Sequence, residues 1–372
     1  MKILFYQPYS QIVVYIESIV EQFANDGHQT YFVSHSEKGA THMNLEKFGC
    51  KTFALPVTRK SFFRYYKSRI SLLASFCKEY EIDIVYSHFQ EANIIAVLAQ
   101  FFCKSTFVIT RHHSDSAFVD NNWKEKWADR IINRFAKLYI ATSPKVYNQI
   151  VEIESANPKK TKLINYGYNF QNFQEVNRDN VEKIKMEYPS KILLVMAARF
   201  TSEKRHLLLI DAINEVIVAG LDIELLVLGR GPMEEKIANY IAKHSLTDRI
   251  FMIGFKLNVM DYFAAADLVV HFSLTEASNS AMKEAAITDT AVAVCNDVGD
   301  FDEYIEHGKN GFLLDKQNPK SDFIEIIRRI DRGEYNLVEI GKQLHKDVVA
   351  RFDIKNVIYE YRNINQAIQN NR

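Results

Sequence analysis

Residues 266–286 read ADLVVHFSLTEASNSAMKEAA, and this stretch lays out a strand, a loop and a helix in turn. The run ADLVVHF is apolar nearly throughout, which is typical of a strand buried on both faces of a parallel sheet. Ser278 or Asn279 is a suitable N-cap for the following helix, because either side chain can accept a hydrogen bond from a free backbone N–H. The stretch therefore predicts one β-α unit.

The same order of elements recurs along the 372 residues, which are too many for one ordinary core. Apolar runs predict strands in both halves: MKILFY, TYFVS, DIVYSHF, STFVIT and KLYIATS, then KILLVMAA, IELLVLG, IFMIG, ADLVVHF and TAVAVCN. Residues 169–187 are polar, lack an apolar strand, and are interpreted as the connection between the halves. The predicted fold class is α/β, with two doubly wound domains, 1–170 and 187–354, facing each other across a ligand-binding cleft that closes on the ligand.

Composition narrows the classes of partner and compartment. Forty-six basic residues balance 46 acidic ones, so net charge offers no argument for nucleic acid. The four cysteines form no C-x-x-C pair and have no zinc-ligand spacing, which favours a reducing cytoplasm. The start lacks the features of a signal peptide, and no window has the roughly 18 consecutive apolar residues of a membrane span. We expect a cytoplasmic protein that touches a membrane at most peripherally.

Two loops of the second half carry cations. Arg199 and Lys204 follow the strand KILLVMAA, where a guanidinium fork and an ammonium group suit an anion such as a phosphate. Gly229 and Gly231 flank Arg230 after the next strand, and glycines there permit a tight turn with close backbone approach. Ordinary surface charge and an ordinary strand-to-helix turn remain the alternative interpretations.

The helix that follows ADLVVHF adds a second anion-binding feature. Backbone N–H groups of Asn279, Ser280 and Ala281 would lie at its amino terminus, and the small side chains leave room for a ligand. Glu276 precedes the helix, and Glu284 lies on it, on the face that carries Ser280. Each carboxylate can accept hydrogen bonds from sugar or ribose hydroxyls. An ordinary start of a helix with a surface glutamate is the alternative, and both stay open.

These motifs together resemble the retaining glycosyltransferases of the GT-B fold, sequence family 4, also described as glycosyl transferases group 1. The E-x7-E pattern, the upstream Arg and Lys, and G-x-G-P match the family in order, and the likeness extends over nearly the whole chain. Further matching segments are NDGHQTYFV, EIDIVYSHF, VITRHH, IATSPKV, INYGYNFQNF and DEYIEHGKNGFLL. The ending ARFDIKNVIYEYRNI resembles the family's tail helix, which implies that residues 355–372 cross back onto the first domain.

The resemblance assigns an acceptor domain to the first half and a nucleotide-sugar donor domain to the second. It implies that Arg199 and Lys204 hold the donor diphosphate, with amides of residues 279–281 binding phosphate or sugar hydroxyls. Glu276 would contact the donor sugar, and Glu284 the ribose. Gly229 and Arg230 would lie near the nucleotide.

The same resemblance implies that His112, at the end of VITRH, lies near the transferred sugar, with His113 as a second candidate. Fixed cations and helix amides can stabilise the charge that develops on a diphosphate leaving group. We therefore expect no metal and no cofactor, with a nucleotide sugar, a UDP-sugar in the first instance, as substrate. The D-x-D of Asp300 and Asp302 is interpreted as a turn.

The predicted function is a hexosyltransferase-type enzyme (EC 2.4) that moves a sugar, with retention, from a nucleotide donor to a cell-surface glycan or lipid-linked acceptor, as in polysaccharide or lipopolysaccharide synthesis. A non-catalytic GT-B subunit that binds glycan or stabilises a partner enzyme is the alternative. A GT-B epimerase acting on the nucleotide sugar is a third class, which the E-x7-E pattern and the tail helix disfavour.

Some segments depart from the family or have a plain structural interpretation. The loop QPYSQIVVY lacks the Gly-Gly of many relatives, and Tyr166 stands where the family has Asn. How the chain binds its acceptor is therefore not decided by the resemblance. His88 is interpreted as a packed or hydrogen-bonded residue rather than a catalytic one, and Glu303 as part of a turn. The tryptophans Trp123 and Trp127 are interpreted as packing residues rather than sugar platforms.

Residues 57–70, VTRKSFFRYYKSRI, interleave cations with aromatic residues. Such a segment can contact an anionic membrane, at about 1 kcal/mol per cation near the surface. A helix that packs its aromatic residues on the core and exposes its charges to water explains the pattern equally well. A nucleic-acid patch is the least favoured of the three interpretations.

Overall fold

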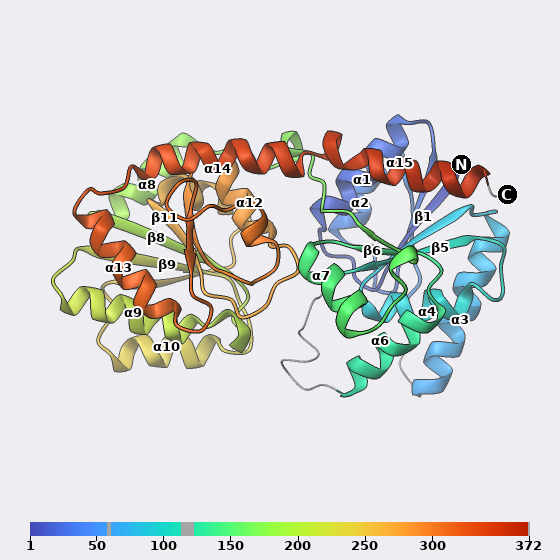
Figure 1. Ribbon diagram of the computed structural model, residues 1–372, viewed down its shortest axis with the longest axis horizontal. Helices are drawn as coiled ribbons and strands as arrows, with labels where there is room; N and C mark the ends of the chain where they lie inside the picture. The colour runs from blue at the N-terminus through green and yellow to red at the C-terminus, as the bar shows by residue number, and fades with distance from the viewer. Residues whose placement is uncertain (58–60, 113–122, 371–372) are drawn as a thin grey trace. The chain divides into compact units, whose positions relative to one another are not determined.

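The computed structural model describes residues 1–57, 61–112 and 123–370, and divides the chain into two compact units. Unit 1 comprises Met1–Asn169 together with Phe352–Arg372, and unit 2 comprises Phe170–Arg351 (Figure 1). Each unit is an α/β structure around its own parallel sheet, as the alternation of apolar runs predicts.

The described part of unit 1 contains a seven-stranded parallel sheet with the order β3-β2-β1-β4-β5-β6-β7. Its strands are β1 (Lys2–Gln7), β2 (Gln29–Ser34), β3 (Lys51–Ala54), β4 (Ile84–His88), β5 (Thr106–Arg111), β6 (Tyr139–Ala141) and β7 (Thr161–Leu163). The strand order reverses between β1 and β4, which makes the carboxyl edge of these two strands the expected ligand position.

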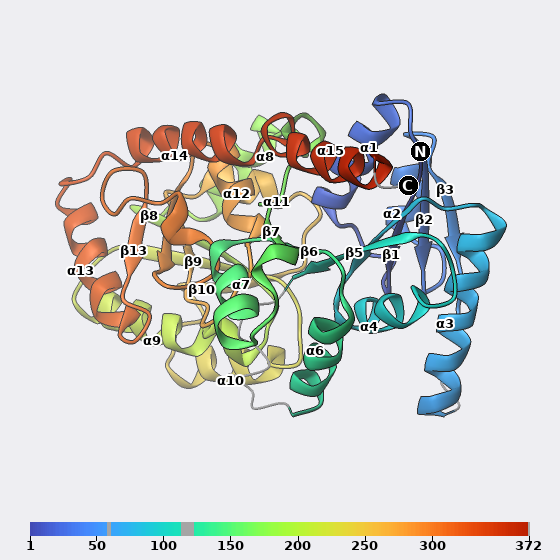
Figure 2. The same ribbon diagram turned by 45° about the vertical axis from the view of Figure 1, so that its right-hand side comes forward.

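Helices cover both faces of the unit 1 sheet (Figures 1 and 2). One group contains α1 (Val14–Asn25), α2 (Ala40–Glu46) and α15 (Ile354–Asn370), and the other contains α3 (Phe62–Glu79), α4 (Gln90–Ala99) and α6 (Trp123–Phe135). The shorter α7 (Pro144–Asn148), η1 (Gln149–Ile153) and η2 (Pro158–Lys160) connect β6 to β7.

The tail helix α15 packs on unit 1, which confirms that the chain crosses back to its first domain. The Tyr86 hydroxyl donates to Asn365 Oδ1 at 2.7 Å, and both groups are buried. At the surface, the Arg362 guanidinium donates to both carboxylate oxygens of Asp26 at 2.7 Å. These contacts join residues 279 and 336 positions apart in sequence, so unit 1 depends on the end of the chain.

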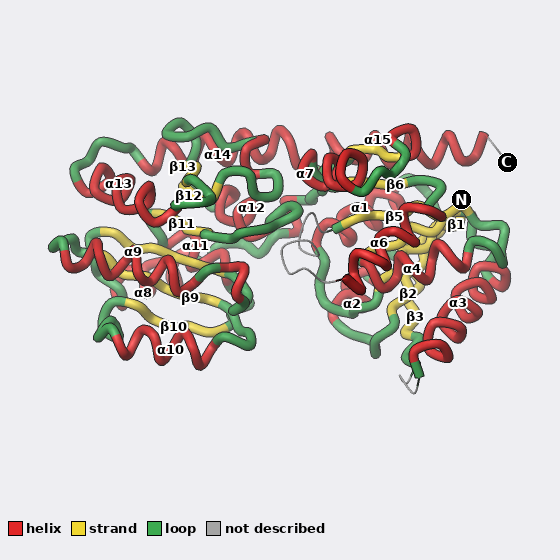
Figure 3. Tube along the Cα trace, turned by 60° about the horizontal axis from the view of Figure 1, so that its bottom comes forward, coloured by secondary structure: helices red, strands yellow, loops and turns green. Residues whose placement is uncertain are grey.

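The described part of unit 2 contains a six-stranded parallel sheet with the order β10-β9-β8-β11-β12-β13. Its strands are β8 (Ile192–Ala197), β9 (Ile223–Leu228), β10 (Ile250–Gly254), β11 (Leu268–His271), β12 (Ala291–Cys295) and β13 (Phe312–Leu314). Figure 3 shows these strands between helices. The strand order reverses between β8 and β11, so the loops after these strands lie side by side.

The helices of unit 2 also form two groups. The first contains α9 (His206–Val218), α10 (Glu234–Lys243) and α13 (Pro319–Asp331), and the second contains α8 (Arg178–Glu187), α11 (Val259–Ala265) and α12 (Ser280–Ile287). The remaining elements are η3 (Phe170–Asn172), η4 (Ser202–Lys204), η5 (Phe301–Glu303) and α14 (Leu337–Phe352).

The polar segment 169–187 is more structured than the sequence suggests. Its second half is helix α8, which packs on α11 and buries Ile184. The Asn177 side chain caps this helix by accepting from Asn180 N–H at 3.2 Å, and Asn177 N–H donates to Asp261 Oδ1 at 2.8 Å. A single buried apolar side chain in an otherwise polar helix leaves little signal in the sequence.

The interpretation of Trp123 and Trp127 as packing residues is wrong. Both lie at the start of α6 with 70% and 54% of their surface exposed. Phe62 and Phe63 at the start of α3 are also exposed, whereas Tyr65 in the next turn is buried, so the packing interpretation of residues 57–70 holds for only part of this helix. Residues 58–60 of that segment lie outside the described residues. None of the helices in the described residues is long and apolar enough to span a bilayer.

Candidate active site

The predicted donor residues gather at the carboxyl edge of the unit 2 sheet. Arg199 and Lys204 follow β8, and Glu276 follows β11, which pairs directly with β8. Leu274 N–H donates to the Glu203 carbonyl at 2.8 Å, so the two loops are tied together by a backbone hydrogen bond. The Arg199 side chain is exposed there, whereas Lys204 is 8% exposed. The topology therefore brings together two segments about 70 residues apart.

Lys204 and Glu276 form an ion pair that is largely shielded from water, with side-chain exposures of 10% and 13%. Lys204 Nζ donates to Glu276 Oε1 and lies 3.5 Å from Ser273 Oγ. His271, the last residue of β11, lies with Nε2 2.6 Å from the same carboxylate oxygen. Because that oxygen carries charge and can only accept, the geometry favours the His271 tautomer that has its proton on Nε2.

The environment keeps Glu276 ionised. Burial alone would raise the pKa of a carboxyl group, but the ammonium of Lys204 and the hydrogen bond with His271 hold the pKa of Glu276 well below its usual range. The carboxylate is therefore negatively charged at every pH near neutrality. It fixes the position of the Lys204 ammonium beside the first turn of α12.

Asn279 caps the helix that follows. Its Oδ1 accepts from Met282 N–H at 3.2 Å, and its Nδ2 donates to Glu276 Oε1 at 3.1 Å. One side chain thus begins α12 and also fixes the carboxylate. Ser280 is exposed and Ala281 partly exposed at this first turn, where backbone N–H groups lack intrahelical partners. The prediction of Asn279 as one of two candidate caps is confirmed.

Glu284 lies one turn further along α12, on the face of Ser280. Burial raises the pKa of the Glu284 carboxyl to about 7, and the neighbouring Ser280 hydroxyl opposes this with a smaller effect. Near neutral pH this group is therefore poised between its neutral and ionised forms. As a neutral acid it can donate one hydrogen bond, and as a carboxylate it only accepts.

The glycine loop after β9 packs against the loop after β8. Gly229 has a φ of +143°, and an added Cβ would lie 1.9 Å from the Ala198 carbonyl oxygen. At Gly231 a Cβ would lie 2.6 Å from the carbonyl oxygen of Phe200. Only glycine permits this approach, which places Arg230 next to the Arg199 loop. The Arg230 guanidinium is exposed and stacks 5.0 Å from the ring centre of Phe255.

In unit 1, His112 lies directly after β5 among aromatic and imidazole groups. His88 Nδ1, at the end of neighbouring β4, is 3.0 Å from His112 Nε2, and the Tyr166 hydroxyl is 2.7 Å from His112 Nδ1. Tyr15 stacks on Tyr166 with ring centres 4.0 Å apart and an angle of 8° between the rings. His88 is fully buried, and burial lowers its pKa to about 3, so it is neutral. His113 lies outside the described residues.

Sequence reasoning missed several residues of these clusters. His271 reads as one polar position in the apolar run ADLVVHF, and its contact with Glu276 depends on how the following loop folds back. Lys283 resembles a surface lysine, yet it is fully buried and donates to Asp300 Oδ2 at 2.7 Å. That contact gives one acid of the D-x-D a structural partner, and Asp302 accepts from a backbone N–H within the same turn.

Within the described residues, no group of three or more His, Cys, Asp or Glu side chains is arranged to hold a metal ion. At this edge of the unit 2 sheet, the Arg199 and Lys204 side chains carry positive charge, and the backbone N–H groups at the start of α12 add a partial positive charge.

Two doubly wound units, one with fixed cations and a helix amino terminus at the reversal point of its strand order, define a glycosyltransferase of the GT-B fold. Comparison with known proteins agrees. A family model described as Glycosyltransferase Family 4 matches residues 12–171, and one described as Glycosyl transferases group 1 matches residues 177–343. The chain belongs to this family of glycosyltransferases, and it is a hexosyltransferase-type enzyme.

Relatives span most of the chain. N-acetyl-alpha-D-glucosaminyl L-malate synthase of Bacillus anthracis is 23% identical over 92% of this chain and 90% of its own. A Campylobacter jejuni diphospho-undecaprenol 4-alpha-N-acetylgalactosaminyltransferase is 22% identical over 66% of this chain and 67% of its own. Among solved structures, Anabaena HepE in complex with UDP and glucose superposes with a TM-score of 0.85 at 19% sequence identity. The superposition covers 99% of this chain and 100% of the Anabaena chain.

Proposed function

We propose that this chain transfers a hexose or N-acetylhexosamine from a UDP-sugar to a glycan or lipid-linked acceptor, with retention at the anomeric carbon and with side chains rather than a metal ion balancing the diphosphate. The observation that carries the proposal is the Lys204–Glu276–His271 cluster beside the first turn of α12. The UDP and glucose bound to the Anabaena relative support this donor class. The printed name of the Campylobacter relative supports a lipid-linked acceptor.

Breaking the bond between the sugar and the diphosphate leaves additional negative charge on the phosphate oxygens. Fixed positive charge for these oxygens comes from Lys204, the exposed Arg199 guanidinium and the N–H groups at the start of α12. In the proposed reaction the acceptor hydroxyl oxygen bonds to the anomeric carbon on the face the diphosphate leaves. Its proton passes to a leaving phosphate oxygen, so no protein group gains or loses a proton overall.

The carboxylates have separate tasks in this proposal. Glu276 keeps Lys204 in place and accepts from a hydroxyl of the donor sugar, for which its ionised state is suited. Glu284 accepts from the ribose hydroxyls. In unit 1, the contacts of His112 with His88 and Tyr166 fix the orientation of its ring, which would suit it to bind a sugar hydroxyl.

A thermal-shift panel of UDP-, GDP-, ADP- and CMP-sugars tests the donor assignment, because a ligand that binds only the folded state raises its stability. We expect stabilisation by UDP-sugars, lost in the Arg199→Ala plus Lys204→Ala variant. Lys243→Ala, an exposed lysine on α10, is the matched control and keeps the response. Each shift is measured against the same variant without ligand. An equal response of the double variant, or none in the wild type, overturns the proposal.

We further propose that unit 1 contacts the anionic inner face of the cell membrane, where a lipid-linked acceptor would be found. The amino-terminal turns of α3 and α6 point to the same side of unit 1, with α4 packed between the helices (Figures 1 and 2). This aromatic-basic surface comprises Phe62, Phe63, Arg64, Lys67, Trp123, Trp127 and Arg130. Phe62 and Phe63 are 66% and 83% exposed, which is unfavourable in water and favourable among lipid headgroups.

Sedimentation with vesicles tests this contact. We expect the full chain to bind phosphatidylglycerol-rich vesicles, to bind phosphatidylcholine vesicles weakly, and to lose affinity as salt is raised. Phe62→Ser plus Phe63→Ser should reduce binding at least about tenfold. Val218→Ser plus Leu257→Ser removes similarly exposed apolar groups from unit 2, at 80% and 82% exposure, and should leave binding unchanged. Equal loss in both variants contradicts the assignment of the surface to unit 1.

A further inference from the structure

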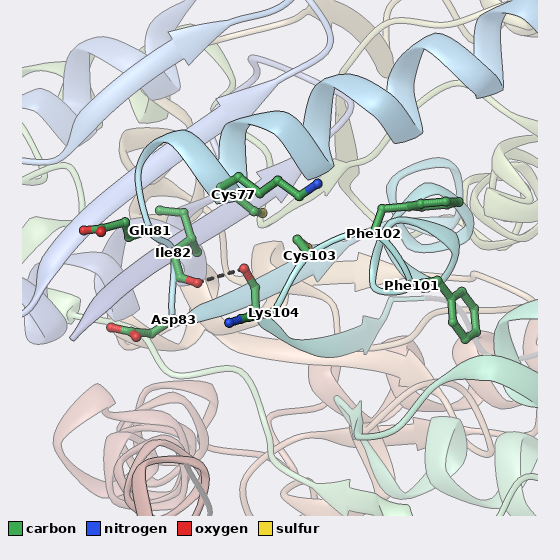
Figure 4. A pocket seen from close by; sticks show the side chains of 10 residues that line it. Cys77, Glu81, Ile82, Asp83, Phe101, Phe102, Cys103 and Lys104 are labelled. Atoms are coloured by element: carbon green, nitrogen blue, oxygen red, sulfur yellow. Dashed lines mark hydrogen bonds between the residues drawn. The ribbon is translucent and has the colours of Figure 1, made fainter.

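A cavity of about 930 Å³ lies at the amino-terminal edge of the unit 1 sheet. Figure 4 shows it between the end of α3, the turn before β4 and the turn between α4 and β5. Because β4 and β5 begin there and end beside His112, this cavity is at the opposite edge of the sheet from the histidine cluster. The reaction proposed above uses none of its residues.

Two cysteines from different elements meet at this cavity (Figure 4). Cys77 belongs to the last turn of α3 and is 2% exposed, whereas Cys103 lies in the turn before β5 and is partly exposed. Both side chains line the cavity, and neither takes part in a disulfide; the Cys103 thiol donates to the Ala99 carbonyl at 3.7 Å. The pair combines a thiol that small molecules can reach with a second thiol directly behind it.

The surroundings of the two thiols differ. The neighbouring Cys77 thiol lowers the pKa of Cys103; burial opposes this, and the Ser105 N–H, the Ser105 hydroxyl and the Lys78 ammonium add to it. The pKa of Cys77 is raised by the neighbouring Cys103 thiol and by burial. The accessible thiol is therefore the better nucleophile, because the thiolate is the reactive form. The charged groups that also line the cavity are Glu81, Asp83 and Lys104.

We propose that Cys103 and Cys77 form a reversible dithiol–disulfide site that reacts with low-molecular-weight disulfides. The Cys103 thiolate attacks one sulfur of the small disulfide, whose S–S bond breaks and releases one small thiolate, which takes up a proton. Cys77 then loses its proton and attacks Cys103 Sγ in the mixed disulfide, releasing the second small thiol. Two electrons and two protons pass from the protein pair to the small disulfide, which becomes two thiols.

The cavity and its charges fit this chemistry. Its volume accommodates the small thiol that is bound to Cys103 between the two steps, and Lys78 and Lys104 suit a thiol compound that carries carboxylates. The bond formed would tie α3 to the turn before β5, where the Ser105 hydroxyl already donates to the Ile82 carbonyl at 2.8 Å (Figure 4). The site is independent of the glycosyl-transfer proposal.

Mass spectrometry of the full chain, incubated reduced at pH 7 with glutathione disulfide, tests the proposal. We expect the loss of two hydrogens and a peptide that links Cys77 to Cys103, with Cys50 and Cys295 left as thiols. Cys77→Ser should accumulate a mixed disulfide on Cys103, because the resolving thiol is missing, and Cys103→Ser should stay unmodified. Cys50→Ser removes another buried thiol and should react as the wild type does.

Two further readouts keep the result independent of folding defects. In the unsubstituted chain, iodoacetamide should alkylate Cys103 at least about tenfold faster than Cys50 at pH 7. Phenylarsine oxide, which needs two neighbouring thiols, should raise the melting temperature of the wild type and not that of Cys77→Ala. A mixed disulfide that persists on Cys103 in the wild type, or equal alkylation of Cys103 and Cys50, overturns the proposal.

Discussion

Glu276 Oε1 is the acceptor shared by Lys204, His271 and Asn279, so the charge of one carboxylate organises this cluster at the carboxyl edge of the unit 2 sheet. We predict that Glu276→Gln lowers the free energy of unfolding at pH 7 by about 3 kcal/mol, because it leaves a buried ammonium without its counter-charge. The folded-state pKa of Glu276 lies below that of the unfolded chain, about 4.3. Its stabilisation is therefore full above that value and lost as the pH falls toward the folded-state pKa.

Urea unfolding of wild type and Glu276→Gln between pH 8 and pH 3 measures this difference. The two curves should lie apart at neutral pH and converge as the solution becomes acidic. Glu234→Gln, which changes an exposed glutamate in the first turn of α10, is the control and should shift stability by less than about 0.5 kcal/mol. A gap between wild type and Glu276→Gln that stays constant with pH would contradict the ion-pair explanation.

Glu284 carries a prediction about binding and pH. Its pKa of about 7 in the free protein means that ribose hydroxyls, which need an acceptor, meet a carboxylate only after the proton has left. We therefore expect the affinity for UDP-glucose to rise about tenfold between pH 6 and pH 8. The diphosphate of a nucleotide sugar does not titrate in this range, so calorimetric titration reports the protein group.

Glu284→Gln is the matched variant, since its side chain has the same size and no proton to lose. Its affinity should be independent of pH over the same interval. The Glu284 account fails if wild type and Glu284→Gln show the same pH dependence, because the titrating group would then be elsewhere.

At the level of elements, a buried ion pair connects α12 to the turn η5. Lys283 and Asp300 have side-chain exposures of 0% and 1%, and the Lys283 ammonium also donates to Ser278 Oγ at 2.9 Å. We predict that Lys283→Met alone lowers the free energy of unfolding by about 3–5 kcal/mol, because it leaves Asp300 charged and unpaired. Adding Asp300→Leu should restore most of that loss, which a double-mutant cycle in urea would measure. Additive effects of the two substitutions would contradict a direct pairing.

Most of the strands could be predicted from sequence because buried parallel strands read as continuous apolar runs. The prediction missed the edge strands β3, β7 and β13, which are too short to produce such a run. The donor loops could be predicted for a related reason: adjacent parallel strands end at one edge, which brings Lys204 and Glu276 together. Helix α8 was hidden, since one buried isoleucine in a polar segment produces no periodic pattern.

The contacts and the burial of individual side chains could not be predicted from the sequence, for physical reasons. Lys283 is preceded and followed by residues that suit any exposed helix, and only the turn around Asp300 buries it. The tryptophans Trp123 and Trp127 have the spacing of a packed helix face, and the same spacing serves an exposed surface when no element covers it. Burial depends on what packs opposite, which is a property of the tertiary fold.

At the level of the whole molecule, α15 makes unit 1 dependent on the last residues of the chain. Tyr361 is 1% exposed, and its ring centre is 5.7 Å from that of Tyr86. We predict that Tyr361→Ala destabilises unit 1 by about 3–5 kcal/mol and leaves unit 2 unchanged, since each unit has its own core. Hydrogen–deuterium exchange of peptides from β4 and β8 measures the stability of unit 1 and of unit 2 separately. Tyr359→Ala, on the same helix at 62% exposure, should affect neither strand, and equal loss of protection in β8 would contradict the assignment.

The central claim is that the cluster beside α12 activates a nucleotide sugar, and the rate of UDP release from UDP-hexoses and UDP-N-acetylhexosamines tests it most directly. The assay supplies lipid-linked and glycan acceptors, with water as the residual acceptor. We predict UDP release by the wild type and by Lys243→Ala, and at least about a hundredfold slower release by Lys204→Ala and by Glu276→Gln. Release that is equally fast in all four proteins, or no release in a protein that binds the nucleotide, would contradict the account.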